Sequence, residues 1–367
     1  MPVVEPASGP RCGGTLAGNT NTAASMVEKE AAKMQLRFRV LLWATLALVV
    51  ATPPVVAQSE FVASYAMPHL FALATATTTR LFGMGGFVTC VPDVGFGNPA
   101  FAATLQTAHA GVRHSETDFD SGLGVSGTQV WYNRPVRPDY SGWQVTFFDL
   151  SSDPGLVNAG GPTLRATVAE RDLALHYGQR VGRQWCWGIG LSPVLDTKTD
   201  YSDPITHTPL ERIESDVDKG ARVGGLYQMG DLGWVGFVYD RYDEDVKWSG
   251  VILSAGSATF TSEEIAVGLS RQVADNVLAA VEWQQLSTEG LGVRLSDSGF
   301  RLGAEVTLSP AWQARGGWND GGLSLGAGWN HGAWSAQYAF VSNWNDDSVR
   351  AALGGSDTHQ LEIRRSW

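Results

Sequence analysis

The chain contains little cysteine, no surplus of basic residues and, beyond residue 57, no long apolar run. Its three cysteines, Cys12, Cys90 and Cys186, are too few for a disulfide scaffold, and their spacing leaves open whether the last two pair. The net charge of -11 excludes the basic surface that nucleic-acid binding requires. Because no later apolar run reaches the roughly 20 residues of a spanning helix, a membrane location would require strands.

Signatures of catalysis and metal binding are also missing. Neither H-E-x-x-H nor G-x-S-x-G occurs, and the seven histidines are scattered without ligand spacing. Gly122 to Gly127 (GLGVSG) matches a dinucleotide pattern, but it leads into the strand-like TQVWYN rather than a helix. The acidic stretch Asp240 to Asp245 lacks the spacing of a calcium loop and is typical of a solvated extracellular loop. We therefore expect no enzyme activity, no cofactor and no metal site.

A secretory signal peptide is predicted at residues 34–57. Two arginines precede the apolar run Val40 to Val50, which is too short for a membrane anchor, and prolines and small residues follow it. This pattern places the cleavage site between Ala57 and Gln58 and indicates export. The preceding residues 1–33 are polar and without periodicity, so they are interpreted as a start-site miscall or a disordered extension.

From Leu105 onward, apolar and polar residues alternate with period two in segments of about ten residues separated by turns. In SEEIAVGLSRQ, for example, Ile265, Val267 and Leu269 share one face, and small or polar residues share the other. Fourteen such segments predict an all-β fold, an antiparallel transmembrane β-barrel over residues 105–367. The expected strands are residues 105–117, 123–133, 142–150, 163–180, 184–195, 221–228, 233–242, 259–271, 277–286, 300–308, 312–318, 323–329, 334–341 and 359–367.

Connector lengths and the end of the chain favour a barrel over a soluble β-sandwich. Tight turns are expected at VADN, SPA and NHGA and long polar loops on the opposite side, an alternation typical of outer-membrane barrels. The chain ends in HQLEIRRSW, where Leu361, Ile363 and Trp367 alternate as in a last strand with an aromatic residue at the lipid interface. The long loops are expected at residues 192–219, 243–257 and 288–299.

Between the signal peptide and the first strand lies RLFGMGGFVTCVPDVGFGNPAFAAT, Arg80 to Thr104. Its glycines would let the backbone run inside a narrow lumen. Together with RVGGLYQMGDLGWVGFVYD, EEIAVGLSRQVADNVLAAVEW and RLGAEVTLSPAWQARGGWNDGGLSLGAGW, this segment resembles the FadL-like channels for long-chain fatty acids and aromatic hydrocarbons. It is equally similar to the related PorV/PorQ-type outer-membrane barrels. The residues that carry the resemblance in the first segment are Arg80, Gly83, Met84, Gly85, Gly86, Asp93, Asn98, Pro99 and Ala100.

The resemblance implies a 14-stranded barrel with an N-terminal plug in its lumen, over residues 58–104, that opens by conformational change for apolar solutes. Phe101 stands where the family usually has glycine. We therefore expect a non-enzymatic protein of a Gram-negative-type outer membrane, inserted into the lipid bilayer by the barrel-assembly machinery and acting as a passive channel for hydrophobic or small solutes. The alternative is a PorV-like barrel that docks secreted proteins or serves as a secretion-system or structural subunit.

Five charged residues fall on the face of the predicted strands that points inward. They either form a selectivity or gating element, or they pair with one another or with the plug to fill the barrel interior. The second reading follows from the need to compensate buried charges. These residues are Glu282, Arg301, Glu305, Arg315 and Glu362.

Overall fold

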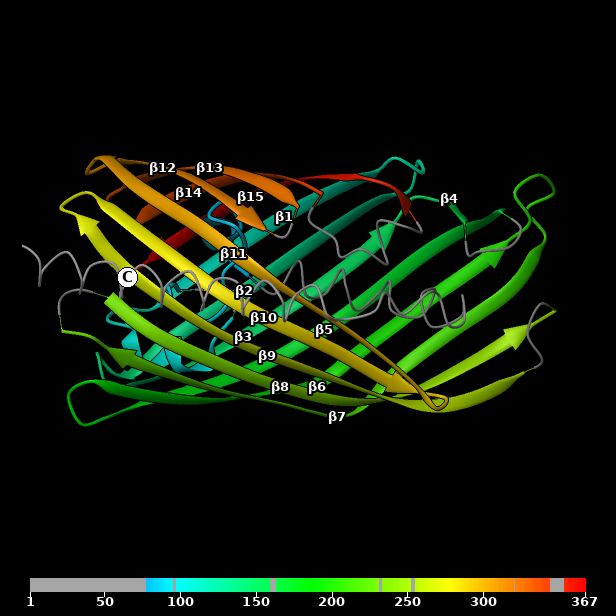
Figure 1. Ribbon diagram of the computed structural model, residues 1–367, viewed down its shortest axis with the longest axis horizontal. Coiled ribbons are helices and arrows are strands. Elements are labelled where there is room, and N and C mark those ends of the chain that lie inside the picture. The colour runs from blue at the N-terminus through cyan, green and yellow to red at the C-terminus, as the bar shows by residue number, and fades with distance from the viewer. Residues whose placement is uncertain are drawn as a thin grey trace, which may run out of the picture. The chain divides into compact units, whose positions relative to one another are not determined.

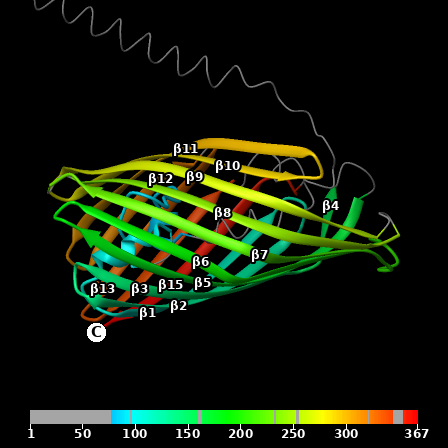
Figure 2. The ribbon, with the colours of Figure 1, turned by 90° about the horizontal axis from the view of Figure 1, so that it is seen from below.

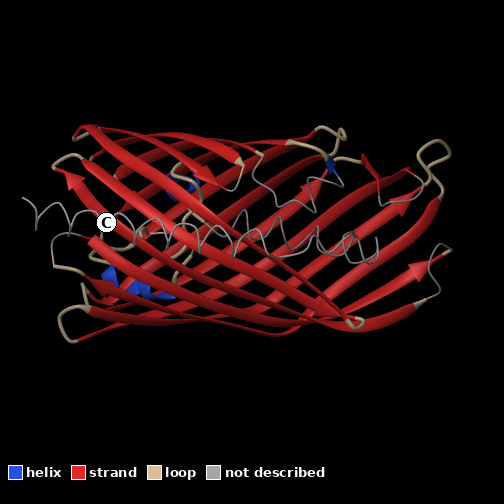
Figure 3. Ribbon diagram, viewed as in Figure 1, coloured by secondary structure: helices blue, strands red, loops and turns tan. Residues whose placement is uncertain are grey.

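In the computed structural model, the described residues form a closed antiparallel β-barrel (Figures 1 and 3). The chain divides into two compact units, residues 1–57 and 58–367, and every described residue belongs to the second. The predicted signal peptide, its cleavage site and residues 58–76 therefore lie outside the described residues. The described residues are 77–94, 97–158, 163–230, 233–251, 255–319, 321–343 and 353–367.

The fifteen strands of the described chain occupy fourteen positions in the barrel wall, which confirms the predicted 14-stranded barrel. β3 and β4 both pair with β5 and are separated only by Asp153 and Pro154, so they share one position. Pairing of β3 with β5 and of β1 with β15 closes the sheet into a barrel. The strands are β1 (His109–Phe119), β2 (Gly124–Arg137), β3 (Ser141–Ser152), β4 (Gly155–Asn158), β5 (Thr163–Val181), β6 (Trp185–Ser202), β7 (Pro209–Gln228), β8 (Gly233–Gly250), β9 (Gly256–Ala274), β10 (Val277–Gly290), β11 (Val293–Ser309), β12 (Trp312–Asn319), β13 (Gly322–His331), β14 (Trp334–Ser342) and β15 (Ser356–Ser366).

The outer surface of the barrel carries an apolar band bordered by polar side chains. Along β8 the outward residues Val235, Phe237 and Tyr239 are exposed and apolar or aromatic, and the next two outward residues are Arg241 and Asp243. This alternation follows from the strand geometry, in which successive side chains point to opposite faces. The strand therefore continues past the apolar band, and its outer face becomes polar where it leaves that band.

The expectation of three long polar loops was wrong, because most of their residues extend the strands (Figure 2). Charged outward side chains beyond the apolar band have the composition of a loop, although the backbone stays paired. For the same reason the acidic stretch from Asp240 to Asp245 lies within β8 rather than in a loop. In place of the loops expected at residues 192–219, 243–257 and 288–299, the connections are residues 203–208, 251–255 and 291–292.

Residues 77–94 and 97–104, here called the lumen segment, run inside the barrel near the end that carries the C-terminus (Figures 1 and 2). The segment contains one short α-helix, α3 (Thr79–Phe82), and one 3-10 helix, η1 (Pro99–Thr104). α3 contacts β13, β14 and β15, whereas η1 contacts β2, β3, β5, β6 and β7. The lumen segment therefore touches strands from both halves of the barrel sequence.

Side-chain caps begin both helices of the lumen segment. The hydroxyl of Thr78 accepts a hydrogen bond from the backbone N–H of Leu81 over 3.3 Å, and α3 ends at Gly83. At η1 the side-chain oxygen of Asn98 accepts from the N–H of Ala100 over 2.9 Å. These caps satisfy backbone N–H groups that lack a partner within the helices.

Candidate functional site

Inward-facing glycines in the barrel wall make room for the lumen segment. A Cβ atom added at Gly303 would lie 1.7 Å from the carbonyl oxygen of Met84, and one at Gly317 would lie 2.0 Å from the same oxygen. At Gly188 an added Cβ would lie 2.3 Å from the carbonyl carbon of Pro99. Any side chain at these wall positions would displace the segment. Further wall glycines that an added Cβ would bring within 3.0 Å of the segment are Gly142, Gly178, Gly224, Gly236 and Gly268.

Sequence reasoning missed this set of wall glycines. Their signal was present, because each is a glycine on the inward face of a strand whose neighbours alternate normally. What the pattern alone does not reveal is that these glycines lie against a single segment of chain, since this depends on strand register.

The lumen segment turns sharply at its first glycines. Gly85 and Gly86 have φ values of 116° and 82°, conformations that side chains rarely adopt. The turn presents the Met84 carbonyl to the wall glycines, while the Met84 side chain is fully buried. Phe101, which departs from the family pattern, is also buried, and its ring packs beside Gly97. Its bulk is thus accommodated within the segment.

Glu282 on β10 binds the middle of the lumen segment. Its carboxylate accepts hydrogen bonds from the backbone N–H groups of Val88 (3.1 Å) and Thr89 (2.8 Å) and from the Thr89 hydroxyl. Arg301 on β11 donates from Nη1 both to this carboxylate, over 3.2 Å, and to the carbonyl of Gly86. A buried carboxylate with this many donors is well compensated.

Glu305 on β11 links the lumen segment to the wall through two arginines. Arg80 of α3 donates from Nε and Nη2 to the two carboxylate oxygens over 2.9 and 2.8 Å, and Arg315 on β12 donates from Nε over 2.6 Å. Burial alone would lower the pKa of Arg80, but the Glu305 and Asp93 carboxylates raise it above its usual range. The bidentate pair therefore stays charged and fixes the orientation of α3.

Asp93 forms a second attachment, at the end of β15. Its carboxylate accepts from the Thr78 hydroxyl over 2.6 Å and from Arg364 Nη1 over 3.0 Å. Burial alone would raise the pKa of Asp93, but the charges of Arg364 and Arg80 and the Thr78 hydrogen bond hold it well below its usual range. Glu362, also on β15, accepts a hydrogen bond from the backbone N–H of Thr79 over 3.2 Å.

Asn98 attaches the second half of the segment to the wall. Its Nδ2 group lies 3.0 Å from the carbonyl oxygens of Thr89 and Gly225 and 3.2 Å from that of Phe237. Arg222 on β7 donates to the carbonyl of Gly97 over 3.2 Å. The structure thus places all five charged residues predicted for the lumen at the contact between wall and segment, in three groups of ion pairs: Glu282 with Arg301, Glu305 with Arg80 and Arg315, and Glu362 with Arg364 and Asp93. The remaining motif residues of the segment are also buried there.

The two described cysteines, Cys90 and Cys186, are unpaired and buried. Both belong to one apolar group between the lumen segment and the wall, with Leu81, Met84 and Phe101. At the end of the chain, Leu361, Ile363 and Trp367 are exposed on the outer face. Among the described residues, no helix has the length and apolarity to cross a membrane, and no group of histidine, cysteine or acidic side chains could hold a metal ion.

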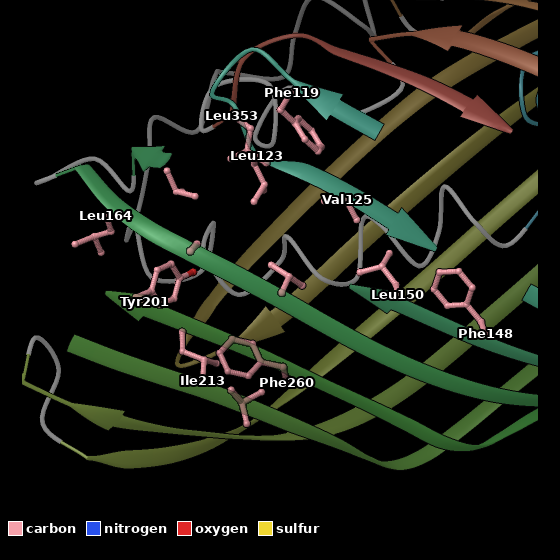
Figure 4. Packing of buried hydrophobic residues seen from close by; sticks show 14 residues of the cluster. Phe119, Leu123, Val125, Phe148, Leu150, Leu164, Tyr201, Ile213, Phe260 and Leu353 are labelled. Atoms are coloured by element: carbon pink, nitrogen blue, oxygen red, sulfur yellow. The ribbon is translucent and has the colours of Figure 1, made fainter. Parts of the chain in front are cut away.

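A second feature of the lumen is an apolar cluster at the end of the barrel opposite the C-terminus (Figure 4). Most of its members sit on inward positions of the strands, whereas Leu123 and Leu353 lie in connections. Figure 4 shows Phe119 and Leu123 on one side of the interior and Ile213 and Phe260 on the other. The sequence had offered no stretch for such a site. The cluster, called the apolar cluster below, comprises Phe119, Leu123, Val125, Phe148, Leu150, Val157, Leu164, Ala166, Val168, Tyr201, Ile213, Val246, Phe260 and Leu353.

Solved structures with a similar barrel include hydrocarbon channels. The toluene transporter TbuX of Ralstonia pickettii superposes with a TM-score of 0.57 at 13% identity, over 81% of this chain and 100% of its own. The monoaromatic hydrocarbon channel CymD gives 0.57 at 12% identity, over 80% and 98% of the two chains. The toluene transporter TodX of Pseudomonas putida gives 0.54 at 9% identity, over 77% and 96%.

The chain has the fold of these hydrocarbon channels. This agrees with the FadL-like barrel that the sequence resemblance indicated. No family model matches the sequence, and no curated protein is similar to it. The likeness therefore concerns the fold, and the function must be argued from the lumen itself.

Proposed function

We propose that the protein is a passive outer-membrane channel for hydrophobic solutes, with the lumen segment as its plug. The observation that carries this proposal is the apolar cluster. Apolar side chains on the inward face of a membrane barrel gain nothing from lipid, and most outer-membrane barrels keep their interior polar. An interior lined by Phe119, Phe148 and Phe260 suits an apolar guest.

The apolar cluster and the lumen segment lie at opposite ends of the lumen, one suited to bind a solute and the other to close the channel. The C-terminus lies at the end where every described connection is short, such as residues 275–276 and 310–311, and this is the periplasmic side in outer-membrane barrels. The apolar cluster lies at the other end, where the strands extend beyond the apolar band. A solute arriving from outside would meet the apolar cluster first and the plug second.

The plug is held by ionic attachments at separate points, which suits a segment that moves. Glu282, Glu305 and Asp93 each accept from groups across the boundary between plug and wall. Opening the channel by moving one attachment would separate a buried charged pair, at a cost of about 3 to 5 kcal/mol. Such a cost keeps the resting channel closed without making opening prohibitive.

The non-enzymatic, outer-membrane assignment belongs to the same proposal. It is supported by the closed barrel, by the apolar outer band and by similar structures that are channels. Insertion by the barrel-assembly machinery follows from the outer-membrane location. The docking alternative has no comparable support, because an apolar interior is not needed to bind a secreted protein at the surface.

Uptake of radiolabelled toluene into vesicles with lipopolysaccharide in the outer leaflet tests the channel. We expect uptake faster than in protein-free vesicles. Phe148→Ser should slow uptake, since it removes an inward ring of the apolar cluster, whereas Phe147→Ser on the outer face of the same strand should leave uptake close to wild type.

Deleting residues 83–100 should accelerate uptake if the segment is a plug. A heat-modifiability gel would first establish that each variant is a folded barrel. Uptake at the protein-free rate, both with the intact chain and after the deletion, would refute the channel.

A further inference from the structure

A polar patch borders the apolar cluster on β3 and β5. Both carboxylate oxygens of Glu170, Oδ1 of Asp172, Oγ1 of Thr146 and Nε2 of Gln144 are buried without a hydrogen-bond partner. Glu170, Thr146 and Gln144 are 1%, 2% and 4% exposed. Buried polar groups are nearly always hydrogen-bonded, so a cluster of unsatisfied atoms on one face indicates a ligand that satisfies them.

The strand register places this patch directly against the apolar cluster. Leu150 pairs with Glu170 across β3 and β5, and Phe148 pairs with Asp172. Side chains paired in this way lie about 5 Å apart on the same face. Val168, the inward residue that precedes Glu170 on β5, also belongs to the cluster. Two carboxylates therefore lie at the edge of an apolar surface.

No described cation is paired with these carboxylates. Arg222, the arginine on the neighbouring strands, donates to Asp240 over 2.8 Å and to Glu264 over 2.9 Å. None of the ion pairs among the described residues includes Glu170 or Asp172. Arg222 also attracts Asp172, but the same guanidinium is shared with Asp240 and Glu264. One cation does not compensate these carboxylates together with Glu170, so the patch is built to receive positive charge from outside the chain.

We propose that Glu170 and Asp172 bind the head group of an amphipathic organic cation, an amine or quaternary ammonium whose apolar part rests on the apolar cluster. This inference depends on the proposed function, because it names a substrate class for the same lumen. A metal ion fits less well, since it would need oxygen ligands on all sides and the described residues hold no such group. Phe148 pairs with Asp172 across the strands, and an aromatic ring is a favourable neighbour for a quaternary ammonium.

Titration calorimetry on the full chain in lipid nanodiscs tests the inference with three ligands that share a benzyl group. Benzyltrimethylammonium, benzyl alcohol and phenylacetate carry a positive, a neutral and a negative head group on the same ring. We expect the cation to bind tightest and phenylacetate weakest. Glu170→Gln should weaken cation binding by about tenfold, the loss typical of a charged hydrogen bond, and leave benzyl alcohol within about twofold.

Asp149→Asn is the matched control, because Asp149 lies on the outer face of β3, exposed and paired with Arg171. It should not change the affinity for any of the three ligands. Asp172→Asn should repeat the effect of Glu170→Gln, which guards against one variant failing to fold.

The inference is overturned if benzyl alcohol or phenylacetate binds as tightly as the cation, or if Glu170→Gln and Asp172→Asn both keep wild-type affinity for it. Calcium binding that competes with benzyltrimethylammonium and is lost in Glu170→Gln would overturn it in favour of an inorganic cation site. If vesicles take up toluene but calorimetry shows no preference for the cation, only this inference is refuted. If calorimetry shows selective binding of the cation but vesicles take up no toluene, only the channel is refuted.

Discussion

Glu282→Gln is predicted to loosen the lumen segment while leaving the barrel intact. Glu282 is 1% exposed and its carboxylate receives the N–H groups of Val88 and Thr89, the Thr89 hydroxyl and Arg301. The amide of glutamine keeps one acceptor oxygen and replaces the other with a donor. If that oxygen takes the place of Oε2, Arg301 loses its acceptor, and the three groups that donate to Oε2 meet a neutral oxygen instead of a charged one.

The size of the effect follows from the lost charge. A hydrogen bond to a charged group contributes about 1.5 to 3 kcal/mol and one between neutral groups about 1 kcal/mol, so the weakening summed over these contacts amounts to about 3 kcal/mol. This free energy corresponds to roughly a hundredfold increase in the equilibrium constant for local opening of the segment. The barrel wall should be unaffected, because the backbone pairing of β10 with β9 and β11 does not involve this side chain.

Cys90 reports the opening, since it lies in the same part of the segment and is fully buried. In a Cys12→Ser, Cys186→Ser background, the rate of maleimide labelling measures how often Cys90 becomes exposed. We expect about a hundredfold faster labelling in Glu282→Gln. Glu289→Gln on the same strand is the control, because the Glu289 side chain is 63% exposed, and it should label at the wild-type rate.

Labelling of Glu282→Gln within about twofold of the parent rate, in a barrel that passes the heat-modifiability test, would refute the reasoning. In that event the hydrogen bonds to Glu282 would not be what holds this part of the segment.

Three further predictions concern other contacts of the segment and the wall. Gly317→Ala should speed Cys90 labelling and lower the melting temperature, because the new Cβ would lie 2.0 Å from the carbonyl oxygen of Met84. Gly316→Ala is the control and should change neither measurement, since the nearest atom to its Cβ would be the Ser324 oxygen at 3.8 Å. Since the pKa of Asp93 is lowered in the folded state, Asp93 should hold the segment at every pH above the ordinary aspartate value, and the hold should weaken only as pH falls below about 4. Labelling rates from about pH 8 to about pH 3, each divided by the rate of an exposed thiol at the same pH, would contradict this profile if the ratio rose already near neutrality. Trp367→Ala should lower the folded fraction on gels, because it removes a ring stacked on Tyr132 of β2 with 5.9 Å between the ring centroids. An unchanged folded fraction would show that the terminal aromatic does not stabilise the barrel.

The sequence by itself predicted the barrel, because strand alternation is a local property. Each of the fourteen expected segments corresponds to a position in the observed wall. The boundaries failed where β6 to β11 continue beyond the apolar band. There both faces are partly polar, and local composition no longer separates strand from loop.

The candidate site divides in the same way. Sequence reasoning selected Glu282 and Glu305 from their residue type and inward position, and Arg80 from the family resemblance. Each takes part in an ion pair or hydrogen bond between segment and wall. It did not identify the wall glycines such as Gly303, nor that Glu170 lies beside Leu150. These relations depend on the strand register, which decides which residues of different strands lie side by side.

Only the tertiary structure decided what fills the lumen. Alternation assigns a residue to the inner or outer face, but it does not say at which height along the barrel the residue lies. That height is set by the register between neighbouring strands and by the tilt that closure of the sheet imposes. Closure therefore gathers residues from Phe119 to Leu353 into one apolar cluster at one end and places the carboxylates that hold the lumen segment at the other.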